Sequence, residues 1–483
     1  ITRRIPAPLP AVEACLDLLT TLQSSVAALP SDVAGRTLAR LVSADPIEDP
    51  TVRAFGALLH TDECRASLYS FFTLQAARKR SRPPGALPAS SSPPRGAPTR
   101  GASTRVGVIG GGLMACQLAV LFADRLNAAV HLTELTPERA QQALVRVLNQ
   151  LDRMVVRGSL TPARRDRLAG LVTASDAVAD QAGSTIVIEA VFEDLAVKRG
   201  VWAAVEAVVS LDCVLLTNTS SLSITDQGAD LLRPERLVGF HFFNPVAVLP
   251  LVEIVRSAHT SRAVVDTAFG LAGALGKTAV LVADQPGFVV NRILTRLFSD
   301  TLALIDGGAD VGIVDGALVN DGLPMTALTL LGYIGPAVQL HILTTMHESY
   351  PDRFAVSPSL VALVDSGLPG YLGRDGKLTP EAAAVLSGVV PSAVPVLREH
   401  DEVREHLLRG LADETARMVA DNTVAAASDI DACMILGGNY PQHTGGLTAL
   451  LDRSGASHAA NGRRFHPHGV ASLPREPEPV FRP

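Results

Sequence analysis

The stretch "RVGVIGGGLMACQLAVLFADRL" (Arg105–Leu126) decides the fold class of this chain. It begins as a short apolar strand and continues, after a glycine-rich turn, with the spacing of a buried helix. The next run, "AVHLTEL" (129–135), has the composition of a second strand. A strand, a tight turn, a helix and another strand form the start of a βαβ unit, which predicts a parallel sheet.

The same alternation continues along the chain. We expect further strands at "STIVIEAV", "CVLLTNTSS", "RLVGFHFF" and "GKTAVLVAD", the last of which should close the sheet. From Pro286 onward the pattern is helical, and 307–335 aligns weakly with 427–455, with Asp315 opposite Asp431. The predicted fold class is therefore α/β: a Rossmann-type, mostly parallel sheet followed by an all-helical C-terminal region with two repeated units.

Composition and periodicity divide the chain into six segments. Large apolar residues nearly vanish in a Pro-, Ser- and Arg-rich stretch, which predicts a flexible linker because such a segment cannot bury enough surface to offset its ordering entropy. The predicted segments are a helical segment (1–77), this linker (78–104), the Rossmann domain (105–285), helical unit 1 (286–375), helical unit 2 (395–457) and a poorly ordered tail (458–483).

Length, charge and cysteines exclude several classes of protein. A chain of 483 residues is too long for one core, and a net charge of −6 argues against a nucleic-acid partner. The 5 cysteines are scattered without CxxC spacing, which favours a reducing, cytoplasmic setting and predicts neither a disulfide framework nor a metal site. No apolar run reaches the roughly 18 residues of a transmembrane helix. Because the chain starts at Ile1 without a leader, we expect a fragment or a processed product.

The glycine-rich turn has the pattern G-x-G-x-x-G/A at Gly110, Gly112 and Ala115. The first glycine permits the turn, the second lets a pyrophosphate approach the backbone, and the helix N-terminus offers free N–H groups. Glu134 ends the next predicted strand, where an acid accepts hydrogen bonds from a ribose 2′-OH and repels a 2′-phosphate. These features favour NAD over NADP. The alternative is a sheet of this type that binds no nucleotide.

The stretch "GFHFFNPVAVLPLVEIV" (Gly239–Val255) does not read as a structural strand, because Pro245 and Pro250 interrupt it. His241 suits a general base, since imidazole changes charge near neutral pH. Glu253 is the nearest carboxylate that could hold the other ring nitrogen, if the prolines let the chain turn back. From this stretch alone, the favoured interpretation of His241 is a core histidine with satisfied hydrogen bonds.

Several motifs together resemble one family, the L-3-hydroxyacyl-CoA dehydrogenases. The matching runs, in order over residues 106 to about 340, are "VGVIGGGLMA", "IEAVFEDLAVK", "NTSSLSIT", "GFHFFNPVAVLPLVEIV" and "DQPGFVVNRIL". The resemblance implies that His241 is the general base, Glu253 its orienting carboxylate, Ser220 a group near the substrate oxygen, and Asn291 a ligand of the reacting group. The cofactor contacts that it implies are Gly110, Gly111, Gly112, Leu113, Met114, Ala115, Glu134, Glu193, Lys198, Ser220 and Asn244, and it implies no metal.

Some of these residues also have simpler interpretations. Glu193 could match the positive end of a helix, Lys198 could lie on a solvated helix face, and Ser221 could cap the next helix. The run "DSGLPGYLGRDGK" stands where the family usually shows a GxGF(Y/F) segment, so no contact is carried over there.

The resemblance implies NAD-dependent oxidation of (3S)-3-hydroxyacyl-CoA to 3-oxoacyl-CoA in fatty-acid β-oxidation. The helical flank and the doubled C-terminal unit are similar to the dehydrogenase part of the alpha subunit of multifunctional fatty-acid-oxidation complexes, without the hydratase domain. A thiolase subunit, or self-association through the helical units, is the partner that this similarity implies. Two other hypotheses remain: a dehydrogenase of a free hydroxy acid, and a non-catalytic scaffold of a multienzyme complex.

Overall fold

The computed structural model describes residues 54, 57–59, 61–81, 104–323, 325–389, 396–467 and 469–470. Most of the predicted segment 1–77, nearly all of the predicted linker and the last part of the predicted tail lie outside these ranges. The sequence-based expectations for those residues therefore stay predictions.

One sheet of eight strands forms the centre of the first domain, in the order β3-β2-β1-β4-β5-β6-β7-β8. Strands β1 to β6 are parallel, β7 is antiparallel to β6, and β8 is parallel to β7. This arrangement confirms the predicted α/β class with a mostly parallel sheet. The strands are β1 (Arg105–Ile109), β2 (Ala129–Thr133), β3 (Val172–Ser175), β4 (Ile186–Glu189), β5 (Val214–Thr217), β6 (Leu237–Phe242), β7 (Leu251–Arg256) and β8 (Thr278–Ala283).

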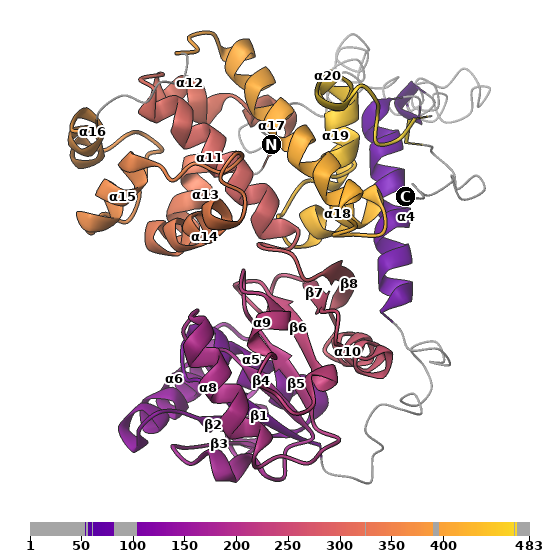
Figure 1. Ribbon diagram of the computed structural model, residues 1–483, viewed down its shortest axis with the longest axis vertical. Coiled ribbons are helices and arrows are strands. Elements are labelled where there is room, and N and C mark those ends of the chain that lie inside the picture. The colour runs from indigo at the N-terminus through magenta and orange to yellow at the C-terminus, as the bar shows by residue number, and fades with distance from the viewer. Residues whose placement is uncertain are drawn as a thin grey trace, which may run out of the picture.

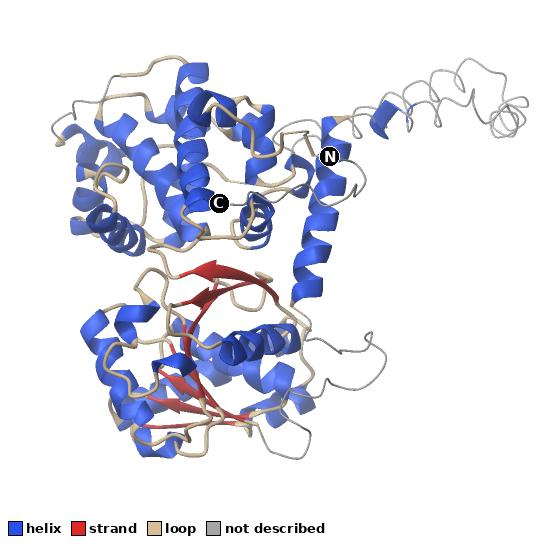
Figure 2. Cartoon of the chain, turned by 45° about the vertical axis from the view of Figure 1, so that its right-hand side comes forward, coloured by secondary structure: helices blue, strands red, loops and turns tan. Residues whose placement is uncertain are grey.

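Helices cover both faces of this sheet, which explains why its strands are almost continuously apolar (Figure 2). On one face, buried side chains of α5, α6 and α10 belong to one apolar cluster with Val106 and Val108, while those of α8 belong to a second cluster with Val187 on the other face. The domain's helices are α5 (Leu113–Leu126), α6 (Pro137–Val156), α7 (Pro162–Ala169), α8 (Leu195–Glu206), α9 (Ile224–Gln227) and α10 (Arg262–Ala274), with 3-10 turns η2 (Val178–Gln181) and η3 (Pro234–Arg236).

Two strands differ from the sequence-based prediction. β3 has only four residues and one fully buried position, so its sequence carries little strand signal. β7 lies within the stretch that we did not expect to form a strand. The prolines stand in the connection between β6 and β7, not inside either strand, and the connection folds back so that His241 pairs with Glu253 in the antiparallel register.

The C-terminal region is helical and lies against the edge of the sheet where β7 and β8 run (Figure 1). Its longest helices, α11 and α17, pack against each other through buried leucines. The helices are α11 (Val290–Asp306), α12 (Val311–Gly316), α13 (Ala327–Ile334), α14 (Pro336–Ser349), α15 (Pro358–Asp365), α16 (Pro380–Ser387), α17 (His400–Ala420), α18 (Ala427–Leu436), α19 (Leu447–Arg453) and α20 (Ala456–Asn461), with η4 (Val319–Asp321) and η5 (Gln442–Thr444).

The aligned aspartates of the internal repeat, Asp315 and Asp431, make the same kind of hydrogen bond in both units. Asp315 on α12 accepts a hydrogen bond from the backbone N–H of Leu328, at the start of α13, at 2.7 Å. Asp431 on α18 accepts one from the N–H of Thr448, at the start of α19, also at 2.7 Å. Each carboxylate thus satisfies a free N–H at a helix N-terminus. The shared contact supports the duplication inferred from the sequence.

Helix α4 (Asp62–Arg80) runs beside both the sheet and helical unit 2 (Figure 1). The hydroxyl of Tyr69 donates to Asp431 at 2.8 Å, and the hydroxyl of Ser81 accepts from the N–H of Ala279 on β8 at 2.8 Å. The helix therefore continues three residues past the predicted boundary at residue 77, and the residue that follows it binds the edge strand β8.

Residues 458–467 are also more ordered than predicted. Helix α20 continues to Asn461, and His466 is buried, with its Nε2 2.8 Å from the hydroxyl of Thr448. Within the described ranges, no single helix is long and apolar enough to cross a membrane, although α13 and α14 together, bent by 102°, meet the criteria of length and composition. The same residues contain no His, Cys, Asp and Glu group that could hold a metal ion.

Candidate active site

The glycine turn between β1 and α5 provides an open, positively polarised cradle. Gly110 has a φ of +109°, and a Cβ there would meet the carbonyl oxygen of Ala190 at 2.7 Å, so only glycine fits without strain. Gly112 is the N-cap of α5 without a side-chain cap, and a Cβ on it would meet nothing within 4 Å. The first N–H groups of α5 therefore face open space, which fits the pyrophosphate of a dinucleotide.

The surroundings of this turn fit the rest of a dinucleotide. Glu134 follows β2 and lies beside the turn, since a Cβ on Gly111 would come within 2.9 Å of its Cγ. Three large apolar side chains are exposed after neighbouring strands: Leu113 (64%), Leu135 (78%) and Phe192 (76%). The three side chains therefore stand at the carboxyl edge of the parallel strands, where a doubly wound sheet binds its ligand.

His241 and Glu253 form a buried pair across the β6–β7 ladder. Nδ1 of His241 is 2.7 Å from Oε2 of Glu253, and the exposed fractions of the two residues are 4% and 0%. Oε1 of Glu253 accepts the backbone N–H groups of Val289 at 3.2 Å and Val290 at 3.0 Å, at the start of α11. Every oxygen of this buried carboxylate is thus hydrogen-bonded, as a buried charge requires. The position at which the sequence favoured a satisfied core histidine has the geometry of an oriented base.

Asn291 and Ser220 form a second pair beside the first. The side-chain amide of Asn291 donates to the carbonyl oxygen of Ser220 at 3.2 Å. Asn291 directly follows Val290 on α11, so consecutive residues of one helix contact both pairs. The structure therefore gathers all four predicted catalytic residues around the first turn of α11.

Glu193 organises the turn that carries Ser220. Its Oε1 accepts the hydroxyl of Thr219 at 2.6 Å, the N–H of Ser220 at 2.7 Å and the hydroxyl of Ser220 at 3.1 Å. Burial raises the pKa of Glu193, but Lys198 and these hydrogen bonds hold it below its usual value. In this arrangement the Ser220 hydroxyl donates to Glu193 and leaves its lone pairs for another group.

Lys198 does not lie on a solvated helix face. Its exposed fraction is 1%, and its ammonium donates to Glu189 at 2.7 Å and pairs with Glu193 at 3.1 Å. Burial disfavours the ammonium, yet the two carboxylates raise the pKa of Lys198 above its usual value. These contacts support a role in holding Glu193 in place, and a direct contact with the cofactor stays a prediction.

Ser221 does not cap the following helix, as one interpretation had it. The hydroxyl of Ser223 accepts the N–H of Asp226 and caps α9 instead. The buried hydroxyl of Ser221 has no hydrogen-bonding partner in the part of the chain that the structure describes.

Two residues that bind the connection between β6 and β7 were missed by sequence reasoning, because their contacts depend on a fold-back of the chain. Gln117 on α5 hydrogen-bonds Asn244 and the backbone of Val246. Lys277, next to β8, donates to the carbonyl oxygens of Val246 and Leu249, and burial lowers its pKa to about 8. Because Gln117 lies on the helix that follows the glycine turn, the sequence could have indicated it as a site residue. A lysine that precedes a strand, such as Lys277, gives no such indication in the sequence.

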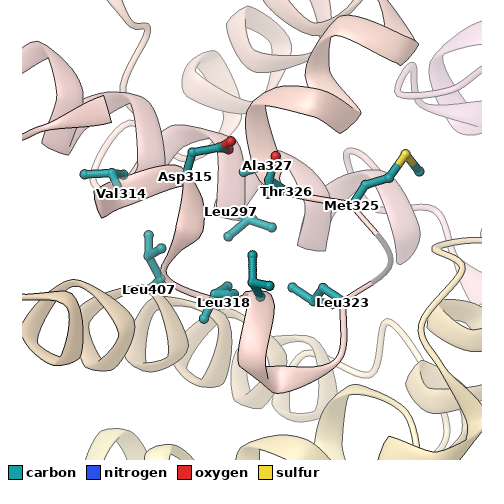
Figure 3. A pocket seen from close by; sticks show the side chains of 10 residues that line it. Leu297, Val314, Asp315, Leu318, Leu323, Met325, Thr326, Ala327 and Leu407 are labelled. Atoms are coloured by element: carbon teal, nitrogen blue, oxygen red, sulfur yellow. The ribbon is translucent and has the colours of Figure 1, made fainter. Parts of the chain in front are cut away.

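A small cavity between α17 and the first helices of the C-terminal region is separate from this site (Figure 3). Its volume is about 10 Å³, enough for one water molecule. Apolar side chains dominate its lining, including Leu297, Leu318 and Leu407, while Asp315 and Thr326 are its polar members. A cavity of this size holds no substrate, so it is a packing feature of the helical region.

This fold and site define a dinucleotide-dependent oxidoreductase. Residues 105–285 match the family model of the 3-hydroxyacyl-CoA dehydrogenase NAD binding domain, and residues 287–378 match that of the 3-hydroxyacyl-CoA dehydrogenase C-terminal domain. Together these ranges cover more than half of the chain. The chain belongs to the 3-hydroxyacyl-CoA dehydrogenase family, and its cofactor is NAD.

Comparisons with individual proteins agree with this assignment. The fatty acid oxidation complex subunit alpha of Psychrobacter cryohalolentis is 32% identical over 365 residues, which are 72% of this chain and 50% of that protein. The chain thus spans about half the length of this curated relative. The crystal structure of FadB2 from M. tuberculosis is 36% identical, with a TM-score of 0.53, and the match covers 58% of this chain and 98% of that one. The 3-hydroxybutyryl-CoA dehydrogenase of Escherichia coli K12 is 23% identical, with a TM-score of 0.61 over 76% of this chain and 96% of that one, which supports the fold alone.

Proposed function

We propose that this chain oxidises (3S)-3-hydroxyacyl-CoA to 3-oxoacyl-CoA, with His241 as the general base. The observation that carries the proposal is the buried contact between His241 Nδ1 and Glu253 Oε2 at 2.7 Å. When Nδ1 carries the proton that faces the carboxylate, Nε2 keeps a free lone pair. That lone pair can take the proton of the substrate 3-hydroxyl group, and Glu253 stabilises the imidazolium that forms.

Bound NAD supplies the acceptor for the hydride that leaves C3. The residues expected to hold it are the glycine turn with Leu113, Met114 and Ala115, together with Glu134, Glu193, Lys198, Ser220 and Asn244. Ser220 and Asn291 are expected to position the 3-oxygen. What supports this is that the Ser220 hydroxyl keeps its lone pairs, while the Asn291 amide has a second N–H beside the one that binds Ser220. Positioning of this kind adds to the roughly 10²–10⁴-fold contributed by a general base.

We also propose that the reaction belongs to fatty-acid β-oxidation. The support is the similarity to the Psychrobacter alpha subunit, which is named for a fatty acid oxidation complex. By the same analogy, the proposed partner is a thiolase subunit, or a second copy that contacts the helical units. A cytoplasmic setting is proposed from the four described cysteines, all of which are free.

The test is NADH formation from (3S)-3-hydroxybutyryl-CoA by wild-type protein and by His241→Ala. We expect wild type to turn over the (3S)-thioester and to reject the (3R)-thioester. His241→Ala should not turn over either thioester. His259→Ala, at an exposed histidine, is the matched control and should behave as wild type. Equal rates for wild type and His241→Ala would refute the proposal. Faster oxidation of free 3-hydroxybutyrate would favour the hydroxy-acid alternative, and inactivity of folded wild type would favour the scaffold.

A further inference from the structure

The side chain of Gln117 links the glycine-turn helix to the loop that follows the strand of the general base. Gln117 lies on the second turn of α5 and is half-buried. Its Oε1 accepts the backbone N–H of Val246 at 2.7 Å, and its Nε2 donates to Oδ1 of Asn244 at 3.0 Å. One amide therefore holds two residues of the loop between β6 and β7.

The backbone N–H of Val246 sets the direction of this chain of hydrogen bonds. A backbone N–H can only donate, so the carbonyl oxygen of Gln117 must face it. The NH₂ group of Gln117 must then face Asn244, which requires the carbonyl oxygen of Asn244 as the acceptor. The orientation of both side-chain amides thus follows from one donor that cannot change its role.

This orientation leaves the NH₂ group of Asn244 available to a ligand. Asn244 is exposed, and within the described part of the chain only its Oδ1 has a hydrogen-bonding partner. It stands two residues after β6, at the carboxyl edge of the parallel strands, and three residues after His241. A hydride acceptor must lie beside the carbon whose hydroxyl His241 deprotonates, so Asn244 is at the nicotinamide end of the crevice. The carboxamide is the hydrogen-bonding group of the nicotinamide ring.

We propose that Gln117 is a positioning residue that makes Asn244 present its NH₂ group to bound NAD, as donor to the carboxamide oxygen of the nicotinamide. This inference rests on the proposed function, because it takes the cofactor site and the base His241 as given. Asn244 touches the cofactor, and Gln117 acts through it. Lys277 also holds this loop, because its ammonium donates to the carbonyl oxygens of Val246 and Leu249.

The test compares the dissociation constants of three dinucleotides by isothermal titration calorimetry, which needs no turnover. 3-Acetylpyridine adenine dinucleotide keeps the acceptor oxygen of NAD but lacks the carboxamide NH₂, whereas thio-NAD replaces that oxygen by sulfur, a weaker acceptor. Wild type should bind NAD and the acetylpyridine analogue similarly, and thio-NAD roughly 2- to 13-fold more weakly, the range of one hydrogen bond. In Gln117→Leu, binding of NAD should weaken by a similar factor, and the preference for oxygen over sulfur should disappear.

A second variant makes the test independent of packing. In Gln117→Glu one carboxylate oxygen still accepts the N–H of Val246, while the other faces Asn244 and turns its NH₂ group away from the crevice. This variant should also lose the preference for oxygen over sulfur, although the loop stays bound. Gln142→Leu, at an exposed glutamine of α6, is the matched control and should bind all three as wild type does.

The outcomes separate this inference from the proposed function. A Gln117→Leu or Gln117→Glu protein that keeps the wild-type preference would overturn the role of Gln117. Wild type that binds thio-NAD as tightly as NAD would overturn the contact with the carboxamide oxygen. Wild type that binds the dinucleotides but fails to oxidise the thioester would overturn the proposed function instead.

Discussion

Replacing Glu253 by glutamine should inactivate the site while leaving it almost unchanged in shape. Glutamine has one carbonyl oxygen where glutamate has two acceptors. Two backbone donors, the N–H groups of Val289 and Val290, converge on Oε1 at 3.2 and 3.0 Å. They fix the glutamine carbonyl at that place, so the NH₂ group must stand against Nδ1 of His241, where Oε2 now lies at 2.7 Å.

The consequence is a change of tautomer. Facing a donor, Nδ1 of His241 must accept, so the imidazole proton moves to Nε2. The nitrogen that should take the substrate proton then has no lone pair. We expect kcat to fall by roughly 10²–10⁴-fold, equivalent to about 3–5 kcal/mol of transition-state stabilisation. The free energy of unfolding should fall less, by about 1.5–3 kcal/mol, because the backbone contacts survive and only one charge-assisted hydrogen bond is lost.

The assay is steady-state NADH formation with (3S)-3-hydroxybutyryl-CoA, together with urea unfolding and calorimetric binding of NAD. Glu253→Gln should bind NAD as wild type does, and Glu381→Gln, at an exposed glutamate of α16, should match wild type in every measurement. An unchanged kcat in a folded Glu253→Gln protein would show that the carboxylate does not select the tautomer of His241, and the proposed mechanism would then be wrong.

Two further predictions concern stability. Burial lowers the pKa of Lys277 from 10.5 to about 8, so between these values the unfolded chain binds more protons than the folded one and stability rises with pH. The unfolding free energy of wild type relative to Lys277→Met should therefore grow by up to about 3 kcal/mol from below pH 8 to above pH 10, and a constant difference in urea titrations would contradict this. Glu414, fully buried, binds Arg292 at 2.5 Å and Arg353 at 2.8 Å, so Glu414→Gln removes a buried carboxylate from two guanidinium groups and leaves Arg292 with Asp421 as its ion-pair partner. It should cost about 3–5 kcal/mol in urea unfolding, whereas Asp413→Asn, on the same helix and part-exposed, should cost less; equal costs would refute the role of Glu414.

The fold class could be predicted because the strands that carry the sheet are uniformly apolar and alternate with helices. β1, β4 and β5 are buried on both faces, and such strands stand out in a sequence. β3 and β7 could not be recognised in the same way. β3 is a four-residue edge strand, and β7 contains a charged side chain whose partner becomes visible only once the chain has folded back. Periodicity describes one element at a time, while an antiparallel register is a relation between two.

In the candidate site, too, local sequence motifs identified the residues but not the long-range contacts that hold them. The motif around His241 identified both residues of the pair, but not the backbone N–H groups of Val289 and Val290 that hold Glu253. The sequence left open whether Lys198 contacts the cofactor or lies on a solvated helix face, and only the packed structure shows it between two carboxylates. Motifs thus predict which side chains carry the chemistry, and tertiary contacts decide what orients them.

The site lies on the boundary between the two parts of the chain matched by separate family models. Glu253 belongs to the sheet, yet two of its three hydrogen bonds come from the start of α11, and Asn291 reaches back from α11 to Ser220. Arg292, the next residue, is fixed in turn by Glu414 of helical unit 2. A shift of α11 would therefore remove two donors from a buried carboxylate and release the Ser220 turn at once, which is unfavourable because an unpaired buried charge is costly. The orientation of the base therefore depends on the contacts that hold α11 against the sheet, and helical unit 2 contributes to them through Glu414.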